Sequence, residues 1–285
     1  MTRNMRIKEK WKAIKKQGVV VKISAALILL FVVAAICAPV CTPYSPTEQS
    51  LLDQMQSPSA EHLLGTDNLG RDVLTRIIYG ARISLTTSLL SGLIAAALGL
   101  FLGLLAGYVG GAVGQVIMRL TDAQLSLPPI VLIMVLATLF GGGVQGVSIV
   151  IGISMMPTYI RMMYGMVLSL KEQDYIFAAR LVGKSQASIM FRHLLPNCFP
   201  SLIVLFTMNL GSSIMIESSL SYLGIGIAPP TPAWGSMVSE GYRYIVTNPS
   251  LALLPGVCVI LVVVSFNIVG DALRDALDPR LRGKL

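Results

Sequence analysis

The chain has 285 residues, of which 54% are apolar and only 13% carry charge. An average soluble domain carries about 25% charged residues, so an ordinary soluble enzyme is excluded, and the mean hydropathy of +0.73 excludes a disordered chain. A formal net charge of +8 is typical of many nucleic-acid-binding proteins. Aromatic residues are sparse here and do not lie beside the basic ones, so no nucleic-acid binding is expected. The composition instead predicts a protein embedded in membrane lipid.

Cysteine and histidine give no sign of a metal site, a cofactor or a disulfide framework. The four cysteines lie in or beside apolar stretches and form no C-x-x-C pair. His62 and His193 lie far apart in the sequence without metal-ligating neighbours, so we expect both to have structural roles. The sequence also has no G-x-x-x-x-G-K-[ST] phosphate loop, no H-E-x-x-H and no G-x-S-x-G motif, so the chain itself is not expected to be an enzyme.

Five charge-free windows are long enough for membrane helices, because a helix needs about 20 apolar residues to cross roughly 30 Å of hydrocarbon. The third window holds the 38 uncharged residues 123–160, and three consecutive glycines, 141–143, provide the break that two crossings need. The sequence therefore predicts an all-α, polytopic membrane protein with six transmembrane helices. Their expected ranges are 23–41, 83–108, 126–140, 147–168, 199–219 and 250–270.

The basic residues predict the orientation. With both termini inside, the inner segments hold 18 Lys/Arg and 7 Asp/Glu, whereas the outer segments hold 4 and 7. The positive-inside rule then places segment 1–22 and tail 271–285 in the cytoplasm, on either side of a transmembrane domain over 23–270. A basic start followed by an apolar run is also typical of a cleaved secretory signal, but this run is longer than a signal core and five further spans follow it.

The outer loop 42–82 changes character at Asp67. Its first part is rich in Pro, Ser and Gln, and its second part has apolar residues at a spacing of four, namely Leu69, Val73, Ile77 and Ala81. Asp72 and Arg76 are spaced for an i,i+4 ion pair. We expect Asp67 to cap a helix that lies along the outer membrane surface before the second span.

Two features of the predicted spans allow a structural and a functional interpretation. Small residues recur every four positions in the second span, at Ala95, Gly99, Gly103 and Gly107. Such a face favours close helix packing, with a sliding surface as the alternative. Arg161 lies inside the fourth span, where we expect it to reach the inner membrane surface, with water or a partner group as the alternative.

The cytoplasmic loop 171–198 carries more apolar side chains than a connector needs. The stretch that starts at Asp174 predicts a short helix closed by Gly183, followed by a second short helix that ends near Pro196. Its apolar residues are Tyr175, Phe177, Ala178, Leu181 and Val182. The pattern favours a hydrophobic helix that docks in a groove on another protein, and the alternative is a surface helix folded back on its own bundle.

The second outer segment, residues 220–248, is rich in glycine and proline and predicts an irregular but stiff loop. Glu217 and Glu240 flank this segment. We expect both to be solvated acids, and the alternative is contact with a cationic ligand or with the basic patch of a docking protein.

Four stretches of the sequence resemble the inner-membrane permease subunits of binding-protein-dependent ABC importers, in the dipeptide, oligopeptide and nickel group. They are residues 62–72, 223–235 and 270–279, together with Ala178, Ala179, Gly183 and Pro196 of the cytoplasmic loop. The likeness covers nearly the whole chain. The loop departs from the family pattern at two positions: Phe177 stands where the family usually has an acid, a glutamate, and His193 stands where a hydrophobic residue is usual. Because the glutamate is absent, the ion pair that it would make is not expected in this chain.

The resemblance implies a type I ABC importer permease fold in the bacterial inner membrane. It also implies a second homologous permease, two cytosolic ATP-binding subunits that hydrolyse ATP, and an extracytoplasmic solute-binding protein as partners. The loop 171–198 becomes the ATPase-coupling segment, with Tyr175, Ala178, Ala179, Gly183 and Pro196 as its carried-over positions. The solute is expected to be a short peptide, or a peptide-like or metal-chelate compound, imported by alternating access.

The competing hypothesis is a secondary transporter or a channel without ATPase partners. Secondary carriers normally place an ionisable residue near the middle of the membrane for the coupling ion. The centres of the predicted windows contain none. The sequence does not distinguish among dipeptides, oligopeptides, glutathione-like peptides, nickel chelates and metallophores as the solute.

Overall fold

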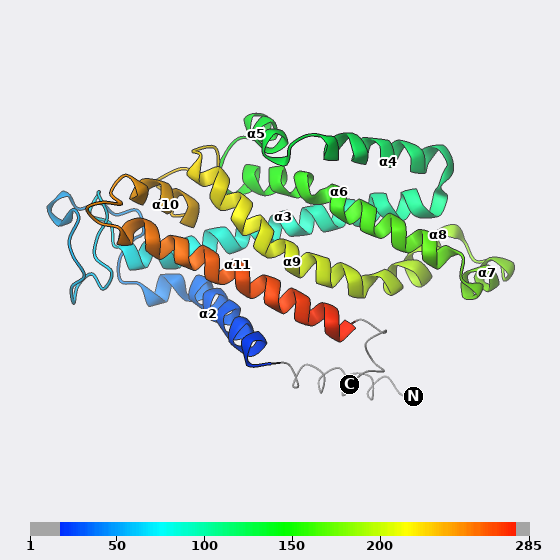
Figure 1. Ribbon diagram of the computed structural model, residues 1–285, viewed down its shortest axis with the longest axis horizontal. Helices are drawn as coiled ribbons and strands as arrows, with labels where there is room; N and C mark the ends of the chain where they lie inside the picture. Colours follow the sequence, from blue (N-terminus) through cyan, green and yellow to red (C-terminus); the bar gives the residue numbers. More distant parts are fainter. Residues whose placement is uncertain (1–17, 278–285) are drawn as a thin grey trace.

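The computed structural model describes residues 18–277, and the regular secondary structure of this part of the chain is helical (Figure 1). Five helices are long and apolar enough to cross a membrane, and a bent pair of shorter helices provides a sixth crossing if it is counted as one span. The prediction of an all-α protein with six spans is therefore confirmed at the level of the fold. The basic residues of 1–17 and the end of the 270–279 stretch lie outside the described residues.

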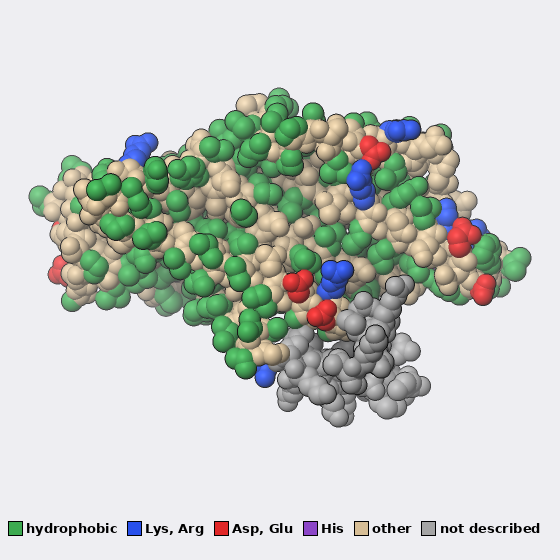
Figure 2. Space-filling view, viewed as in Figure 1, with side chains coloured by type: hydrophobic (Ala, Val, Ile, Leu, Met, Phe, Trp, Pro, Cys, Tyr) green, Lys and Arg blue, Asp and Glu red, His purple; other side chains and the backbone are tan. Residues whose placement is uncertain are grey.

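The helices follow one another in the order of their labels in Figure 1. The long ones run along the bundle in both directions (Figure 1), and hydrophobic side chains cover much of the face seen in Figure 2. The elements are α2 (Val19–Cys41), η1 (Leu51–Asp53), α3 (Val73–Val109), α4 (Gly111–Ser126), α5 (Pro129–Phe140), α6 (Gly143–Lys171), α7 (Asp174–Leu181), α8 (Gln186–Ile189), η2 (Met190–Leu194), α9 (Leu195–Tyr222), α10 (Trp234–Tyr242) and α11 (Ser250–Leu277).

The third crossing is not the single helix expected over 126–140. α5 has 12 residues, which gives it a length of about 18 Å, too short to cross alone. The preceding helix α4 meets it at an angle of 102°. Prolines at 128 and 129 cause the break, because a residue before proline is driven out of the helical region, and Leu127 is extended with φ −84° and ψ 139°.

The second crossing also differs from its prediction at the start. A helix was expected to begin at Asp67, lie along the membrane surface and then turn into the span. Instead α3 is one helix of 37 residues that begins at Val73, with Asp72 as its N-cap. The Asp72 carboxylate accepts a hydrogen bond from Thr75 N at 2.7 Å, so the local cap, and not the apolar spacing, determines where the helix starts.

The small-residue face of α3 packs closely on α6, as the spacing of four predicted. A Cβ atom added at Gly103 would lie 2.7 Å from the Cβ of Met163, and one added at Gly107 would lie 2.8 Å from the Cβ of Val167. Both distances are far below ordinary contact. The two helices approach each other so closely that side chains larger than hydrogen would separate them.

The bundle has two distinct ends. At the loop end, the segments 42–72 and 223–233 and helix α10 cover the helix termini (Figure 1). At the opposite end, here called the α7–α8 end, the two short helices protrude. The loop 220–248 is less irregular than expected, because Trp234 and Met237 share one face of α10 and are both buried against the bundle. The indole of Trp234 donates to the backbone oxygen of Ile77 at 3.0 Å.

Candidate functional site

Helix α7 is fixed to the bundle on one side only. Asp174 lies in its first turn, where an acid interacts favourably with the helix dipole. Ile176 is fully buried and Ala179 is buried beside it, and both belong to the core formed with α3, α6 and α9. The outer face is exposed. α7 is therefore a protrusion whose inner face anchors it and whose outer face is available.

Gly183 ends α7 in the conformation that the sequence predicted. Its φ is +77°, in the left-handed region that favours glycine. Gly183 N donates to the backbone oxygen of Arg180 at 2.9 Å, and Lys184 N donates to that of Ala179 at 3.1 Å. These two bonds form the paired C-terminal cap that reverses the chain after a helix. The chain then enters α8, which Ser185 caps by accepting from Ser188 N.

A short π-helix joins α8 to α9, and Tyr175 of α7 lies next to the start of α9. The π-helix Met190–Leu194 leads into Pro196, which occupies the first turn of α9, where a missing N–H is tolerated. The amide of Asn197 donates to the backbone oxygen of His193 at 2.6 Å and lies 3.5 Å from the Tyr175 hydroxyl. Burial, and to a smaller extent Cys198, raises the pKa of Tyr175, so its hydroxyl keeps its proton at neutral pH.

The five positions carried over from the family resemblance gather at the α7–α8 end, but they do not all face outward. Tyr175, Ala178, Gly183 and Pro196 are exposed. Ala179 is 7% exposed and contacts the core. Within the described structure, Ala179 therefore supports α7 and offers little contact surface of its own.

The tip of α7 exposes large apolar side chains. Leu181 is 88% exposed, Val182 is 79% exposed and Phe177 is 44% exposed. The sequence did not single out Arg180, whose guanidinium lies 5.8 Å from the centre of the Phe177 ring and 5.6 Å from that of Tyr108. A water-facing tip with this composition is typical of a surface that another protein covers.

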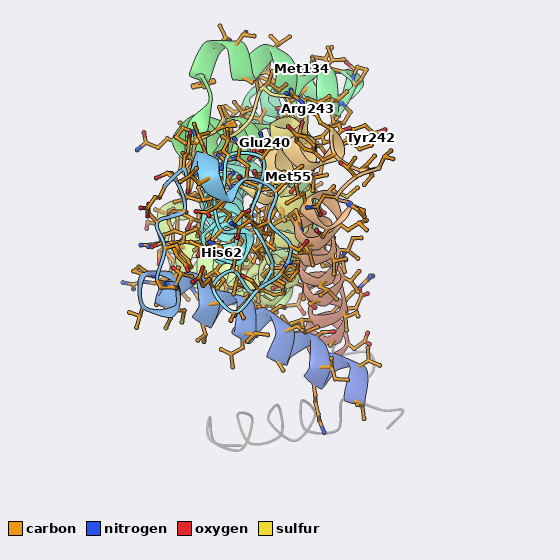
Figure 3. All side chains as sticks on the ribbon, turned by 90° about the vertical axis from the view of Figure 1, so that its left-hand side faces the viewer. Met55, His62, Met134, Glu240, Tyr242 and Arg243 are labelled. Carbon is orange, nitrogen blue, oxygen red and sulfur yellow. The ribbon has the colours of Figure 1, made fainter. Side chains whose placement is uncertain are left out.

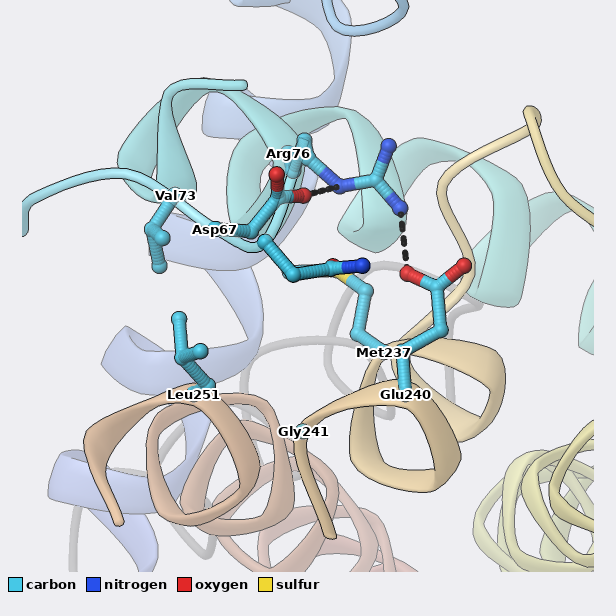
Figure 4. A pocket seen from close by; sticks show the side chains of 8 residues that line it. Asp67, Val73, Arg76, Met237, Glu240, Gly241 and Leu251 are labelled. Atoms are coloured by element: carbon cyan, nitrogen blue, oxygen red, sulfur yellow. Dashed lines mark hydrogen bonds and ion pairs between the residues drawn. The ribbon is translucent and has the colours of Figure 1, made fainter. Parts of the chain in front are cut away.

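The loop end holds a cluster of buried charges that the sequence did not predict. Arg71 and Arg76 are each 1% exposed. The Asp67 carboxylate lies 2.7 Å from Arg71 Nε and 3.4 Å from Arg76 Nε. The Glu240 carboxylate lies 2.9 Å from Arg71 Nη2 and 3.2 Å from Arg76 Nη2. Figure 4 shows Arg76 between the two acids, and Figure 3 places Glu240 near the middle of the loop end.

This cluster corrects three expectations. Asp67 does not cap a helix but accepts from the backbone of Leu69 and Arg71 and from the Arg71 side chain. Asp72 does not pair with Arg76, because its carboxylate caps α3 and lies 3.0 Å from Nδ1 of His62. Glu240 is not a solvated acid, since it is bound by two arginines. Together these groups connect the 42–72 loop, the start of α3 and α10.

Glu217 also differs from its expected place at the surface. It is fully buried in α9 and accepts from the hydroxyl of Ser84 at 2.9 Å and from that of Ser221 at 2.8 Å. The Ser221 hydroxyl in turn accepts from Ile227 N at 3.0 Å. Glu217 therefore links α9 to α3 and holds the loop that follows α9.

Arg161 finds a partner instead of extending alone to the membrane surface. Its Nη2 lies 2.6 Å from Oδ1 of Asp122 on α4, and both side chains are about half exposed. The pair joins α4 to α6. Within residues 18–277, no group of three or more His, Cys, Asp or Glu side chains is arranged to hold a metal ion.

Three comparisons with known proteins agree with this architecture. Residues 99–283 match the family model described as binding-protein-dependent transport system inner membrane component. The chain is 40% identical to the glutathione transport system permease protein GsiD of Salmonella paratyphi A over 97% of this chain and 91% of that protein. It is 39% identical to the GsiD protein of Escherichia coli O6:K15:H31 over 96% and 91% of the two chains.

The fold is similar to that of a chain in an inward-facing structure of the MetNI methionine ABC transporter. The TM-score is 0.59 at 18% identity, over 71% of this chain and 96% of that chain. At this identity the likeness supports the fold alone. The family match and the near-full-length relatives show more: the chain belongs to the binding-protein-dependent transport system inner membrane components, as a multi-pass permease of the inner membrane.

Proposed function

We propose that this permease is one membrane subunit of an ATP-driven importer that carries a peptide-like solute into the cytoplasm. The observation that carries the proposal is the exposed apolar tip of α7, in a chain that belongs to the permease family. The relatives named as glutathione transport permeases support a short peptide or a peptide-like compound as the solute.

The α7–α8 segment is the proposed docking site for an ATP-binding subunit. Leu181 and Val182 would enter a groove on that subunit, with Tyr175 and Ala178 beside them on the exposed face. Ala179 and Ile176 fix the opposite face of α7 to α6 and α9, so a displacement of the segment is transmitted to the membrane helices. ATP hydrolysis is assigned to the partner, because this sequence has no phosphate-binding loop.

The proposed assembly contains a second homologous permease, two cytosolic ATP-binding subunits and an extracytoplasmic solute-binding protein. The excess of Lys and Arg in the segments assigned to the inside supports an orientation with the α7–α8 end and both termini in the cytoplasm. The loop end then faces the solute-binding protein. Labelling of a Lys184→Cys variant in intact cells tests the orientation, because an impermeant external reagent should not reach that position.

The experiment for the function is uptake of radiolabelled glutathione and trialanine by vesicles that contain the assembled transporter. We expect ATP-dependent accumulation of at least one of these probes, which stops when the ATP-binding subunits are omitted. Accumulation driven by a proton or sodium gradient without ATP would instead support a secondary transporter. The isolated chain should hydrolyse no ATP.

A further inference from the structure

The geometry points to a binding site for a carboxylate group of the solute, in a pocket that α4 lines along its first twelve residues and that the C-terminal part of α6 lines at Tyr164. Arg119 is the contact that the site would offer. The inference rests on the proposed import of a peptide-like solute and adds to it a place on the transport path. It concerns this chain's own side chains and not the solute-binding protein.

The pocket is large enough for part of a peptide. Its volume is about 360 Å³, within the range of roughly 300–1,000 Å³ that is usual for small-molecule sites. The turn between α3 and α4 borders open space at Gly110 and Gly111, since a Cβ atom added at either glycine would meet nothing within 4 Å. The polar side chains of the lining are those of Gln115, Arg119 and Asp122 on α4 and Tyr164 on α6.

The charges in this pocket leave one cation available. Asp122 lines the pocket, but its carboxylate is already paired with Arg161 at 2.6 Å. Arg119 is exposed and, among residues 18–277, makes no ion pair and no side-chain hydrogen bond. With Asp122 and Arg161 offsetting each other, the positive charge of Arg119 remains for an anionic group.

The position of these charges argues for a path that contains water or solute. Arg119 lies half-way along α4, and its neighbours Val116 and Leu120 are 58% and 67% exposed apolar residues. Arg161 lies well inside the long apolar helix α6. Figure 2 shows a small group of basic and acidic side chains over α4 and α6, on a face that is otherwise largely hydrophobic. Charged side chains in membrane-spanning segments normally face a water-filled space or a partner, because lipid does not solvate them.

The chemistry of the pocket selects a carboxylate. A guanidinium donates two parallel N–H bonds to a carboxylate, in a planar geometry that a lysine ammonium does not offer. Gln115 of α4 and Tyr164 of α6 provide further polar groups in the lining of the pocket. A short peptide always carries a C-terminal carboxylate unless it is modified, and glutathione carries two. A phospholipid phosphate offers a similar anion, so the experiment has to separate these two sources.

The test measures how fast N-ethylmaleimide labels a cysteine in the pocket. Gln115→Cys is introduced into a chain whose four native cysteines are replaced by alanine, and the transporter is assembled in nanodiscs of phosphatidylcholine. We expect millimolar S-methylglutathione to slow labelling at least threefold, and its diethyl ester, which lacks free carboxylates, to have no effect. Adding Arg119→Gln should abolish the protection, whereas Arg119→Lys should keep part of it.

Arg82→Gln is the matched control, because Arg82 is also an exposed arginine on a spanning helix and also has no ion-pair partner among the described residues. Protection should persist in this control. Equal protection by the acid and the ester, or protection that survives Arg119→Gln, would overturn the inference. If phosphatidylglycerol in the nanodisc slows labelling and S-methylglutathione does not, the anion belongs to lipid and the inference is also wrong.

A second measurement separates this inference from the proposed function. In the native-cysteine background, uptake of glutathione or trialanine by Arg119→Gln vesicles should fall at least fivefold, with the ATPase activity in the absence of solute unchanged. Normal uptake by this variant would leave the importer proposal standing and overturn the pocket. Protection of the pocket cysteine without any ATP-dependent uptake by the unmodified transporter would instead overturn the importer proposal.

Discussion

The two ends of this permease are built in opposite ways. At the loop end, irregular backbone is held by buried charges, with Arg71 and Arg76 both 1% exposed and both bound to Asp67 and Glu240. At the α7–α8 end, the short helix α7 exposes apolar side chains, and Leu181 at its tip is 88% exposed. One end is therefore fixed by ion pairs among its own buried groups, whereas the other presents apolar side chains on a protruding helix. Exposed leucines also occur at the loop end, at Leu51 and Leu52, but they lie in a single short turn.

This contrast shows where each end finds its stability. A loop with few regular hydrogen bonds needs side chains to fix it, and the two arginines connect three segments that are distant in the sequence. A short helix such as α7 is marginal on its own, so it depends on its buried face and, in the proposed assembly, on a partner. Four predictions test this contrast.

The largest effect is expected at the loop end. Arg71→Met removes one cation from the buried cluster and leaves Asp67 and Glu240 with a single shared arginine. Breaking a buried ion pair costs about 3–5 kcal/mol, so the thermal unfolding temperature in detergent should fall strongly. Arg82→Met, at an exposed arginine of α3, the helix that begins two residues after Arg71, is the control and should change little. Equal behaviour of the two variants would mean that the cluster does not stabilise the fold.

The second effect separates the two faces of α7. Ile176→Ala removes a fully buried side chain, and such truncations cost about 2–5 kcal/mol of the free energy of unfolding. Leu181→Ala truncates an exposed side chain of the same helix and should change that free energy by less than about 0.5 kcal/mol. Unfolding of both variants, measured on the isolated chain, checks this. The prediction fails if Leu181→Ala is as destabilising as Ile176→Ala.

The third effect concerns the turn after α7. Gly183→Val introduces a β-branched residue at φ +77° in open space, so the cost is backbone strain of about 1–3 kcal/mol and not a clash. We expect the chain to insert normally but to bind its ATP-binding subunit more weakly or to uncouple ATP hydrolysis from uptake. Gly165→Val is the control, because Gly165 is helical and equally open. Wild-type coupling in the Gly183 variant would show that the turn does not position the docking surface.

The smallest effect on stability is expected from Arg161→Gln. Arg161 and Asp122 form a pair whose side chains are 53% and 48% exposed, and exposed pairs contribute about 0–1 kcal/mol. The unfolding temperature should therefore move much less than in Arg71→Met. A fall in the unfolding temperature as large as that of Arg71→Met would mean that this exposed pair stabilises the fold as much as the buried cluster does. The expected difference between buried and exposed ion pairs would then be wrong.

Local patterns in the sequence predicted much of the fold. Hydropathy located all five long helices, and the glycines at 141–143 correctly separated α5 from α6. The spacing of Gly99, Gly103 and Gly107 predicted a close contact with another helix, and the structure identifies that helix as α6. Gly183 marked the end of α7 for a similar local reason.

Features that depend on distant residues were not predicted. The charge cluster joins residues up to 169 positions apart, and nothing in the spacing of Asp67, Arg71 and Arg76 indicates that Glu240 completes it. Glu217 resembles a surface acid by its place beside a loop, yet serines of two helices bury it. The bend between α4 and α5 lies at the prolines 128 and 129, near the start of the span expected over 126–140, and that expected range did not include the separate helix α4 that precedes them.

The central claim is that the apolar tip of α7 is a docking surface for an ATP-binding subunit, and paired substitutions at the two ends test it directly. Leu181→Glu with Val182→Glu changes two exposed residues of the α7–α8 end, and Leu51→Glu with Leu52→Glu changes an equally exposed pair at the loop end. The measurement is the amount of ATP-binding subunit that co-purifies with each well-inserted variant. The account predicts at least a tenfold loss for the first pair and none for the second. Full retention by the first pair, or an equal loss from both, would contradict it.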